Sequence, residues 1–569
     1  MKISKARRYV GVVAVLALAA TACTDDEPSV EPTGTGTGAA SDGIFSTYII
    51  EPEHLSVANT NESEGNAVMR SLSKGLVDYD PQTTEPFNQV AASIESDDFT
   101  TYTVTLNEGW TFHDGEAVTA QSFVDSWNYN AYAPNGAQVA GFFSAIEGYA
   151  DVNPAAPEAT ADDPSPTPPP PTAETMSGLT VVDETTFTVT LSAANPQWTL
   201  QLGYLAYHPV PSAFFDDPVT FEEAPIGNGP FMMEGAWNHD VKISVRRYDA
   251  YAGTDPALSG GIDFQIFADD NTALNAFRDG TLDIVDQVPP DEIPLVAQEF
   301  PEGLEESPQS AFNYLGFPTY IFDQDDEAAI ALRRALSLTI DRATNASTVL
   351  NDAVDPLDSI IPPVIPGSRA GTEPCQWWTY DPEEAVAQFE AAGGLDYLNS
   401  EFPDGLVFWF NSGSVHELWT EAIANSWTQI LGIPSDSITF QALEFSEYLP
   451  LLDAKGVTGL YRLGWGMDYP SPQNFLEPLY HSGQVPPNGS NNFDFNDPEF
   501  DALIAQGNAA ATLDEGIPFY QQAEDIICDK LPVTPHHLSK NTFVSSENVS
   551  GVYVDAFGDI NYTQISVAG

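Results

Sequence analysis

The first 23 residues constrain this chain most, because they decide the compartment in which the rest of it folds. Bases at positions 2, 5, 7 and 8 precede an apolar run from Tyr9 to Ala20. A helix needs about 20 apolar residues to span a bilayer, so this run is typical of a cleaved signal peptide, residues 1–22, and not of an anchor. We therefore expect the remainder of the chain to fold outside the cytoplasm.

The next segment predicts a lipid anchor. Ala20, Thr21 and Ala22 lead into Cys23, which resembles the lipoprotein box of bacterial lipoproteins, although Ala20 stands where Leu is usual. We expect lipidation of Cys23, with ordinary secretion as the alternative. Residues 23–43 are rich in Pro, Thr, Gly and Ser, a composition that behaves as a flexible tether.

Two cysteines, Cys375 and Cys528, remain after Cys23. An even number in an oxidising compartment indicates a disulfide between them, with two buried free thiols as the alternative. A zinc site is a weaker interpretation, because His536 and His537 follow Cys528 without a CxxC pair or spaced histidines. We predict no metal site.

The charge is strongly one-sided, with 83 Asp and Glu against 18 Lys and Arg and a net charge of −65. Loss of the signal peptide leaves 14 bases and a net charge of −69. No basic stripe is then available for phosphates, so nucleic acid and anionic lipid are not expected partners. The 42% of apolar residues excludes a disordered chain.

Mixed α/β patterns fill the body of the chain. Apolar residues alternate with Thr at 101–106 and 186–191, which predicts two strands. Asp381, Pro382 and Glu384 predict a helix start, and Gly393 predicts its end. Residues 152–171 are dense in Pro and Ala, so we expect an exposed loop there.

Eight short motifs follow one another along the chain: 51–55 (EPEHL), 75–81 (GLVDYDP), 110–120 (WTFHDGEAVTA), 225–231 (PIGNGPF), 277–283 (FRDGTLD), 332–342 (LRRALSLTIDR), 380–393 and 464–470 (GWGMDYP). In this order they resemble the extracytoplasmic solute-binding proteins of ABC importers, family 5, which includes oligopeptide- and dipeptide-binding proteins. Two departures are Gln121 after Ala120, where an acid is usual, and Asn228, where Thr is common.

This resemblance implies an α/β, two-lobed periplasmic-binding-protein-like fold (type II), with the ligand cleft between the lobes and a subdomain inserted in the first lobe. The implied segments are lobe I at 44–65, 175–308 and 541–569, the inserted subdomain at 66–174 and lobe II at 309–540.

The resemblance also implies binding and delivery without chemical turnover. The expected ligands are short peptides, and the expected partners are ABC permease subunits with their cytoplasmic ATPases. The protein would be a monomer that needs no cofactor and touches the membrane only through its lipid. No GxSxG, HExxH or GxxxxGK[ST] motif occurs in the chain, so the sequence lacks the motifs that common hydrolases and ATPases require.

In peptide-binding relatives, the residue that matches Asp468 holds the ligand's α-amine, and one that matches Arg462 meets the carboxylate of a short peptide. Gly464, Trp465 and Gly466 would supply backbone hydrogen bonds. Tyr48 and Ile50 are expected on the opposite wall. The alternative for Arg462 is a structural ion pair.

Other functions remain open at this point. The family also contains binders of oligosaccharides and of nickel or its chelates, and tryptophans at 377, 378, 409, 419 and 465 are suited to stacking on sugar rings. More remote alternatives are a secreted enzyme and a sensory or adhesive surface lipoprotein.

Overall fold

The structure is a computed structural model that describes residues 41–568, apart from 61, 82, 156–166, 413–414, 444 and 487–488. The predicted signal peptide, Cys23 and most of the tether lie outside the described residues, as does the middle of the Pro-rich loop. None of the helices in the described part is long and apolar enough to cross a bilayer.

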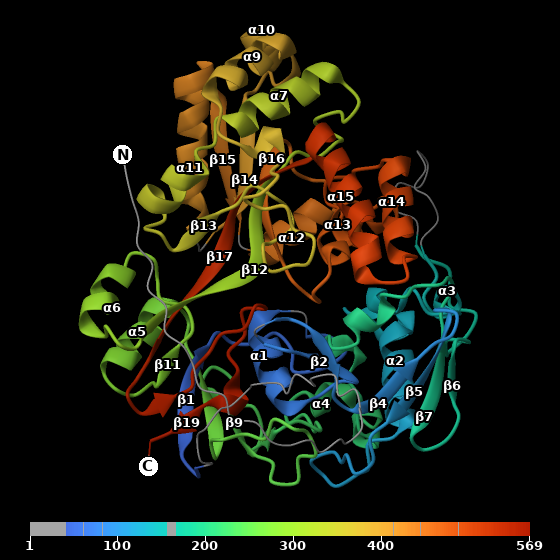
Figure 1. The fold of residues 1–569 in the computed structure, drawn as a ribbon. Helices are drawn as coiled ribbons and strands as arrows, with labels where there is room; N and C mark the ends of the chain where they lie inside the picture. The colour runs from blue at the N-terminus through green and yellow to red at the C-terminus, as the bar shows by residue number, and fades with distance from the viewer. Residues whose placement is uncertain are drawn as a thin grey trace, which may run out of the picture. The chain divides into compact units, whose positions relative to one another are not determined.

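Among the described residues, the largest element is a mixed sheet of eleven strands (Figure 1). Its order is β15-β14-β16-β12-β17-β11-β1-β10-β9-β8, and β13 pairs with β17 outside this path. The bounds are β1 Ile44–Ile49, β8 Phe231–Met233, β9 Lys242–Arg247, β10 Gly261–Ile266, β11 Ile284–Val285, β12 Leu304–Gly316, β13 Val354–Pro356, β14 Leu406–Asn411, β15 Ile438–Leu443, β16 Leu460–Gly466 and β17 Val533–Ser545.

Two long strands, β12 and β17, lie in the middle of this sheet and join its two ends. They pair antiparallel from Leu304 opposite Val544 to Gly316 opposite Val533, with an irregularity between Pro308 and Phe312. The predicted lobe boundaries at 308/309 and 540/541 fall within these two strands. They remain predictions.

A second, antiparallel sheet has the order β4-β5-β7-β6. Its strands are β4 Ala91–Glu95, β5 Thr101–Leu106, β6 Leu179–Val181 and β7 Thr186–Thr190. The two Thr-rich strands pair with each other, and their buried face, which includes Val104 and Phe187, packs with Phe123 and Trp127 of α2 (Ala120–Ala131). We call these strands with α2 the small-sheet subdomain. Strands β6 and β7 belong to this sheet, although they follow residue 174, where the predicted inserted subdomain ends. The bounds of the inserted subdomain also remain a prediction.

Helices cover both faces of the sheet around β16. On one face, α7 (Glu327–Leu338), α9 (Pro382–Ala392) and α11 (His416–Ser426) share a core with Leu460. On the other, α13 (Pro472–Tyr480), α14 (Pro498–Asn508) and α15 (Leu513–Lys530) share a core with Tyr461 and Leu463. The remaining α-helices are α1 Ser63–Leu72, α3 Tyr149–Val152, α4 Pro218–Phe221, α5 Asp270–Arg278, α6 Ile293–Glu299, α8 Arg342–Thr344, α10 Gly394–Glu401 and α12 Phe445–Asp453.

The ends of α9 confirm the local prediction for this helix. The Asp381 side chain accepts hydrogen bonds from the backbone amides of Glu383 and Glu384, 3.1 and 3.0 Å away. At the other end Gly393 adopts φ +104°, a left-handed conformation that favours glycine. Capping residues at both ends therefore fix the length of this helix.

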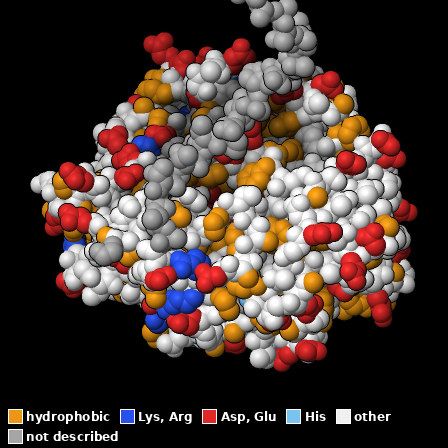
Figure 2. Space-filling view, turned by 60° about the horizontal axis from the view of Figure 1, so that its bottom comes forward, with side chains coloured by type: hydrophobic (Ala, Val, Ile, Leu, Met, Phe, Trp, Pro, Cys, Tyr) orange, Lys and Arg blue, Asp and Glu red, His pale blue; other side chains and the backbone are white. Residues whose placement is uncertain are grey.

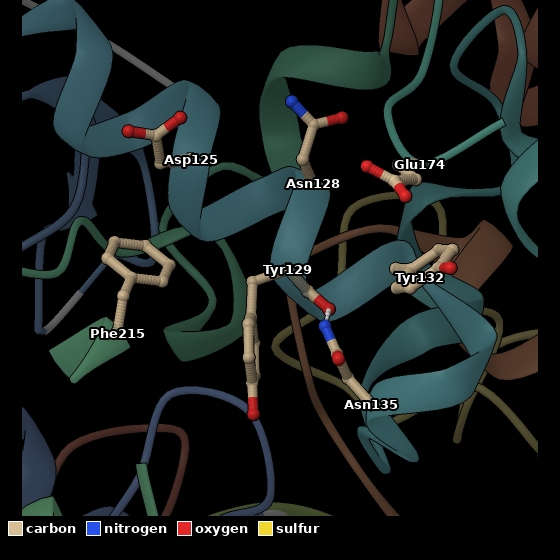
Figure 3. Close-up of a pocket in the computed structure, with 7 residues that line it drawn as sticks. All are labelled: Asp125, Asn128, Tyr129, Tyr132, Asn135, Glu174 and Phe215. Atoms are coloured by element: carbon tan, nitrogen blue, oxygen red, sulfur yellow. Dashed lines mark hydrogen bonds between the residues drawn. The ribbon is translucent and has the colours of Figure 1, made fainter. Parts of the chain in front are cut away.

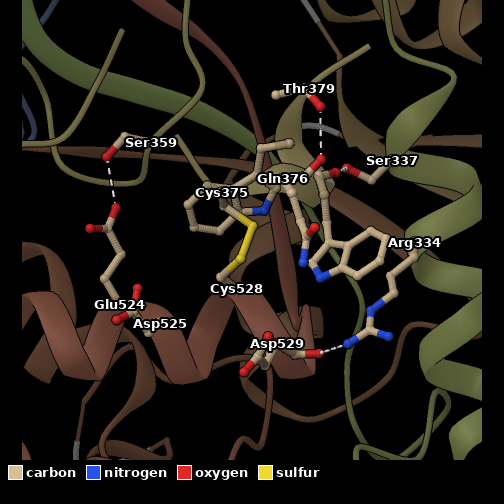
Figure 4. The surroundings of a disulfide bond; sticks show 12 residues. Arg334, Ser337, Ser359, Cys375, Gln376, Thr379, Glu524, Asp525, Cys528 and Asp529 are labelled. Atoms are coloured by element: carbon tan, nitrogen blue, oxygen red, sulfur yellow. Dashed lines mark hydrogen bonds between the residues drawn. A yellow bond between two sulfur atoms is a disulfide. The ribbon is translucent and has the colours of Figure 1, made fainter. Parts of the chain in front are cut away.

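Cys375 and Cys528 form a disulfide, with their Cα atoms 5.8 Å apart. It connects the short helix η7 (Gln376–Trp378) to α15, as Figure 4 shows. The bond closes a segment with a sequence separation of 153 residues. A cross-link between such distant residues restricts the unfolded chain strongly.

The surface reflects the acidic composition. On the face shown in Figure 2, acidic side chains are scattered widely, whereas Lys and Arg side chains gather mainly in one place. Many bases are paired: Lys242 and Arg246, for instance, both form ion pairs with Asp263.

Candidate ligand-binding site

The predicted ligand segment begins on β16, and one edge of this strand is open. Strand β12 pairs with β16 from Gly316 opposite Tyr461 to Ala311 opposite Gly466. On the other side, β14 pairs with it only at Leu460 and Tyr461. Within the described residues, the edge from position 462 to 466 therefore has no strand partner. Such an edge can pair with the backbone of an extended peptide.

Arg462 lies on this strand with its guanidinium held by neutral groups. Its Nη1 donates to Asn411 Oδ1 at 2.8 Å, and its Nη2 donates to Asn313 Oδ1. The Nε has no hydrogen-bond partner in the described part of the chain. The residue is only 9% exposed, and burial lowers the pKa of Arg462 to about 10, so it stays charged at neutral pH.

Two other buried arginines, Arg333 and Arg342, also form no ion pair among the described residues and bind backbone carbonyls and a hydroxyl instead. The charge of Asp323 acts to raise the pKa of Arg333, and that of Asp358 acts likewise on Arg342. No carboxylate acts in this way on Arg462, and it forms no ion pair among the described residues. The predicted alternative, a structural ion pair, is therefore not seen for Arg462 within the described residues.

Two imidazoles lie near the Arg462 guanidinium. Burial lowers the pKa of His416 to about 2 and that of His537 to about 3, and the charge of Arg462 contributes to both shifts. Trp419 Nε1 donates to His416 Nδ1 at 3.3 Å. Both rings are therefore neutral at physiological pH, and they do not compensate the charge of Arg462.

Asp468 presents the opposite case, a half-buried carboxylate without a cation. Asn474 Nδ2 donates to its Oδ2 at 2.9 Å, and the Asp468 amide donates to Asn474 Oδ1 at 3.0 Å. No ion pair to this carboxylate occurs in the part of the chain that the structure describes. Burial raises the pKa of Asp468 to about 6. An ammonium group would stabilise the ionised form.

Tyrosines from a distant part of the sequence lie near Asp468. Burial raises the pKa of Tyr79 and of Tyr204, and the charge of Asp468 adds to both shifts. The adjacent Tyr469 is buried in the core of the small-sheet subdomain. The Asp468 carboxylate therefore lies close to residues that precede position 210 as well as to α13.

The residues between the two charges leave space along the strand edge. Gly466 is exposed, and a Cβ placed there would meet no atom within 4 Å. A Cβ on Gly464 would lie 3.3 Å from the Phe312 carbonyl oxygen and 3.5 Å from Arg462 Nη2. Trp465 is half-buried, and its indole Nε1 has no hydrogen-bond partner among the described residues.

The structure does not bring Tyr48 into this arrangement. Strand β1 lies inside the sheet, between β10 and β11, and the Tyr48 backbone is paired opposite Gln265. The buried Tyr48 hydroxyl donates to Asp270 Oδ1 at 2.7 Å. Ile50 follows the strand and is 42% exposed. The Ile50 side chain is thus exposed and that of Tyr48 is buried, and the roles of both residues remain predictions.

Two cavities lie away from this segment. One, of about 220 Å³, opens beside α2 and is lined by Asp125, Asn128, Tyr129, Tyr132, Asn135, Glu174 and Phe215 (Figure 3). The other, of about 540 Å³, is lined by acids and polar residues that include Asp323, Asp325 and Asp494. Neither is lined by Asp468 or Arg462. No cluster of His, Cys, Asp or Glu suited to a metal ion occurs in the described residues.

Sequence reasoning missed the residues that support the two charges. Asn313 and Asn411 reach Arg462 from neighbouring strands, and Tyr204 approaches Asp468 from another part of the fold. None belongs to a recognisable motif. Only the strand order and register bring them to the site.

The fold and the unpaired charges define a class of protein, the two-lobed α/β proteins that bind a solute between their lobes. Solved relatives share this fold: the Escherichia coli murein tripeptide binding protein MppA matches with a TM-score of 0.75 and 22% identity, over 93% of this chain and all of that one.

The family model for bacterial extracellular solute-binding proteins, family 5, matches residues 85–487, and the chain belongs to this family. The oligopeptide-binding protein OppA of Bacillus subtilis is 25% identical over 90% of each chain. A probable deoxycholate-binding periplasmic protein of Escherichia coli, YgiS, is 24% identical over 85% of this chain and 86% of its own. The family consists of extracytoplasmic binding proteins of importers, which agrees with the predicted class.

Proposed function

We propose that this protein captures short peptides outside the membrane and delivers them to an ABC permease. One observation carries the proposal: within the described residues, a single segment presents a carboxylate without a cation at Asp468, an open strand edge, and a guanidinium without an anion at Arg462. A peptide supplies an ammonium, a backbone and a carboxylate, and so complements all three.

The proposed contacts use only what all peptides share. Asp468 would pair with the α-ammonium, because a buried ammonium without a counter-ion is strongly disfavoured. The planar fork of Arg462 would bind both oxygens of the carboxylate. The edge at 464–466 would pair with the ligand backbone as an added strand. Side chains would then contribute little, so specificity would be broad.

An oligosaccharide is the main alternative ligand, and the structure limits which tryptophans could stack on it. Trp378 and Trp419 are fully buried and cannot stack on a ligand. Trp377 lies under the Arg334 guanidinium, 4.2 Å from its ring centroid. Only Trp409 and Trp465 are half-buried near the open edge. The free charges at both ends favour a zwitterion over a neutral sugar.

The remaining parts of the proposal come from the family and the N-terminal sequence. A lipid on Cys23 and a tether at 23–43 would hold the protein, as a monomer, at the outer face of the cytoplasmic membrane. The permease would carry the peptide across the membrane, and its ATPase subunits would supply the energy. The protein itself would return the peptide chemically unchanged.

Mass spectrometry of the ligand that co-purifies with the protein tests this function. The expected result is a mixture of di- to pentapeptides, recovered intact after incubation with a peptide library. A bound sugar or steroid would overturn the peptide assignment, and cleaved peptides would overturn the assignment as a binding protein.

A further inference from the structure

Gln197 contacts helices that lie more than 300 positions later in the sequence. Its Nε2 donates to the Gly507 carbonyl of α14 at 2.6 Å, and its Oε1 lies 3.2 Å from the Tyr520 hydroxyl oxygen of α15. The next residue, Trp198, is fully buried in the core of the small-sheet subdomain. The amide is therefore anchored on one side and bonded on the other.

A glycine makes room for this amide. A Cβ on Gly516 would lie 2.8 Å from Gln197 Nε2, too close for a real contact. Gly516 is buried inside α15, where glycine is intrinsically disfavoured. The same Cβ would lie 2.9 Å from the Gly507 carbonyl oxygen, so the close approach of α14 and the Gln197 amide together account for a small residue at this helix position.

From Tyr520 a series of hydrogen bonds continues toward the ligand segment. The Tyr520 hydroxyl donates its one proton to Asn508 Oδ1 at 2.8 Å, the shorter of its two contacts. Asn508 Nδ2 donates to Glu477 Oε2 at 2.8 Å, and Gln473 Nε2 donates to the same oxygen at 2.5 Å. The members of this series from Asn508 onward lie on α14 and α13.

The series ends beside Asp468. Gln473 Oε1 accepts from the Tyr469 hydroxyl at 2.5 Å, and the Tyr469 ring is buried in the small-sheet core. Asn474, the neighbour of Gln473 on α13, holds the Asp468 carboxylate. The helix that positions Asp468 thus lies in one polar network with Gln197, and Tyr469 and Gln197 are two separate contacts with the small-sheet subdomain.

We infer that Gln197 is a positioning residue for ligand capture: it latches the small-sheet subdomain onto α14 and α15 and thereby favours the arrangement in which Tyr469, next to Asp468, packs in the small-sheet core. This inference rests on the proposed function only in placing the ligand at Asp468. Gln197 does not touch the ligand, so its contribution does not depend on the chemistry of the ligand's ends.

The test compares Gln197→Ala with the wild type in calorimetry against trialanine and N-acetyl-trialanine. The latch predicts an affinity lower by about tenfold for both peptides, since both need the same arrangement. Gln121→Ala, a change of an exposed glutamine on α2 that bonds only Asp125, is the matched control and leaves both affinities unchanged. Unchanged affinities in Gln197→Ala, or a loss for only one peptide, would overturn the inference.

A second measurement does not depend on the ligand. Small-angle X-ray scattering of the ligand-free proteins is expected to give a larger radius of gyration for Gln197→Ala than for the wild type and for Gln121→Ala. Equal radii would overturn the latch even if peptides bind. If the wild type binds no peptide, the proposed function fails, and the scattering result still decides the latch. Tyr520→Phe, which keeps the aromatic ring, is expected to increase the radius of gyration less than Gln197→Ala does. It serves as a second variant in case Gln197→Ala misfolds.

Discussion

Arg462 precedes Asp468 by six residues on one segment, and neither has a charged partner of opposite sign among the described residues. Buried charges are normally paired, because an isolated ion loses its hydration without compensation. Arg462 has two amide oxygens, and Asp468 has one amide group. Polar groups of this kind orient a charge but do not neutralise it, so the pair is suited to a ligand that carries both charges.

Arg462→Met tests the anionic end. Replacing an uncompensated buried charge with an apolar side chain of similar length is expected to leave the free energy of unfolding unchanged or to raise it, by roughly 1–4 kcal/mol. The same change is expected to weaken binding of trialanine by about 30-fold or more, because the carboxylate loses its partner. Denaturant unfolding and calorimetry measure the two effects. Trialanine amide serves as the control ligand and should bind both proteins alike; a loss of stability with unchanged binding would assign Arg462 to structure.

The pKa of Asp468 predicts a pH dependence with a defined sign. Because burial raises this pKa to about 6, from about 3.9 in an unfolded chain, the folded protein binds the extra proton between these values. The contribution of Asp468 to the free energy of unfolding therefore falls as the pH rises from about 4 to 6, by at most about 3 kcal/mol. Binding of an ammonium needs the ionised form, so affinity for trialanine should fall about tenfold per pH unit below 6.

Calorimetry from pH 4.5 to 7.5 on the wild type and Asp468→Asn separates this group from all others that titrate. The fall in affinity below pH 6 is expected in the wild type and absent in the variant. The same pH profile in both proteins would show that another group controls binding.

Gly466→Ala tests the open strand edge. A Cβ at this position meets no atom of the chain within 4 Å, so the free energy of unfolding should change by less than about 0.5 kcal/mol. The added methyl group is expected to obstruct a peptide backbone at this edge and to lower affinity about tenfold, with or without N-acetylation. Gly141→Ala is a matched control, because Gly141 also has open space and no positive φ. Unaltered binding in Gly466→Ala would place the ligand elsewhere.

The disulfide is expected to support stability rather than binding. In the chain-entropy model, a cross-link over 153 residues contributes up to about 5 kcal/mol. The double variant Cys375→Ala/Cys528→Ala should therefore unfold at lower denaturant concentration, while trialanine still binds at 25 °C. The wild type in a strong reductant should behave like the variant. A midpoint that does not respond to reductant would count against this role.

Local elements of the fold were predictable from sequence because their causes are local. The two Thr-rich strands follow from alternation, and α9 follows from Asp381 at its start and Gly393 at its end. The family motifs extended this to the two-lobed fold. The bounds of the inserted segment are harder to predict, since β7 pairs with β5 about 85 positions earlier, and sheet partners far apart in sequence leave no local mark.

The candidate site was predictable only in part, for the same physical reason. Arg462 and Asp468 belong to one continuous motif, and neither has a counter-ion in the part of the chain that the structure describes. Tyr48 was assigned to the wall opposite them, which remains a prediction; its backbone pairs with Gln265 of β10, and its hydroxyl donates to Asp270. Strand order decides this, and strand order is a property of the whole sheet. Asn313 and Tyr204 were missed because register and packing place them.

The central claim is that Asp468 holds the α-ammonium of a peptide. Calorimetry with trialanine and N-acetyl-trialanine, on the wild type and Asp468→Asn, tests it most directly. The account predicts that acetylation weakens binding to the wild type by about 100-fold, that Asp468→Asn weakens trialanine by a similar factor, and that acetylation has little further effect in the variant. Equal binding of the two peptides by the wild type would contradict it.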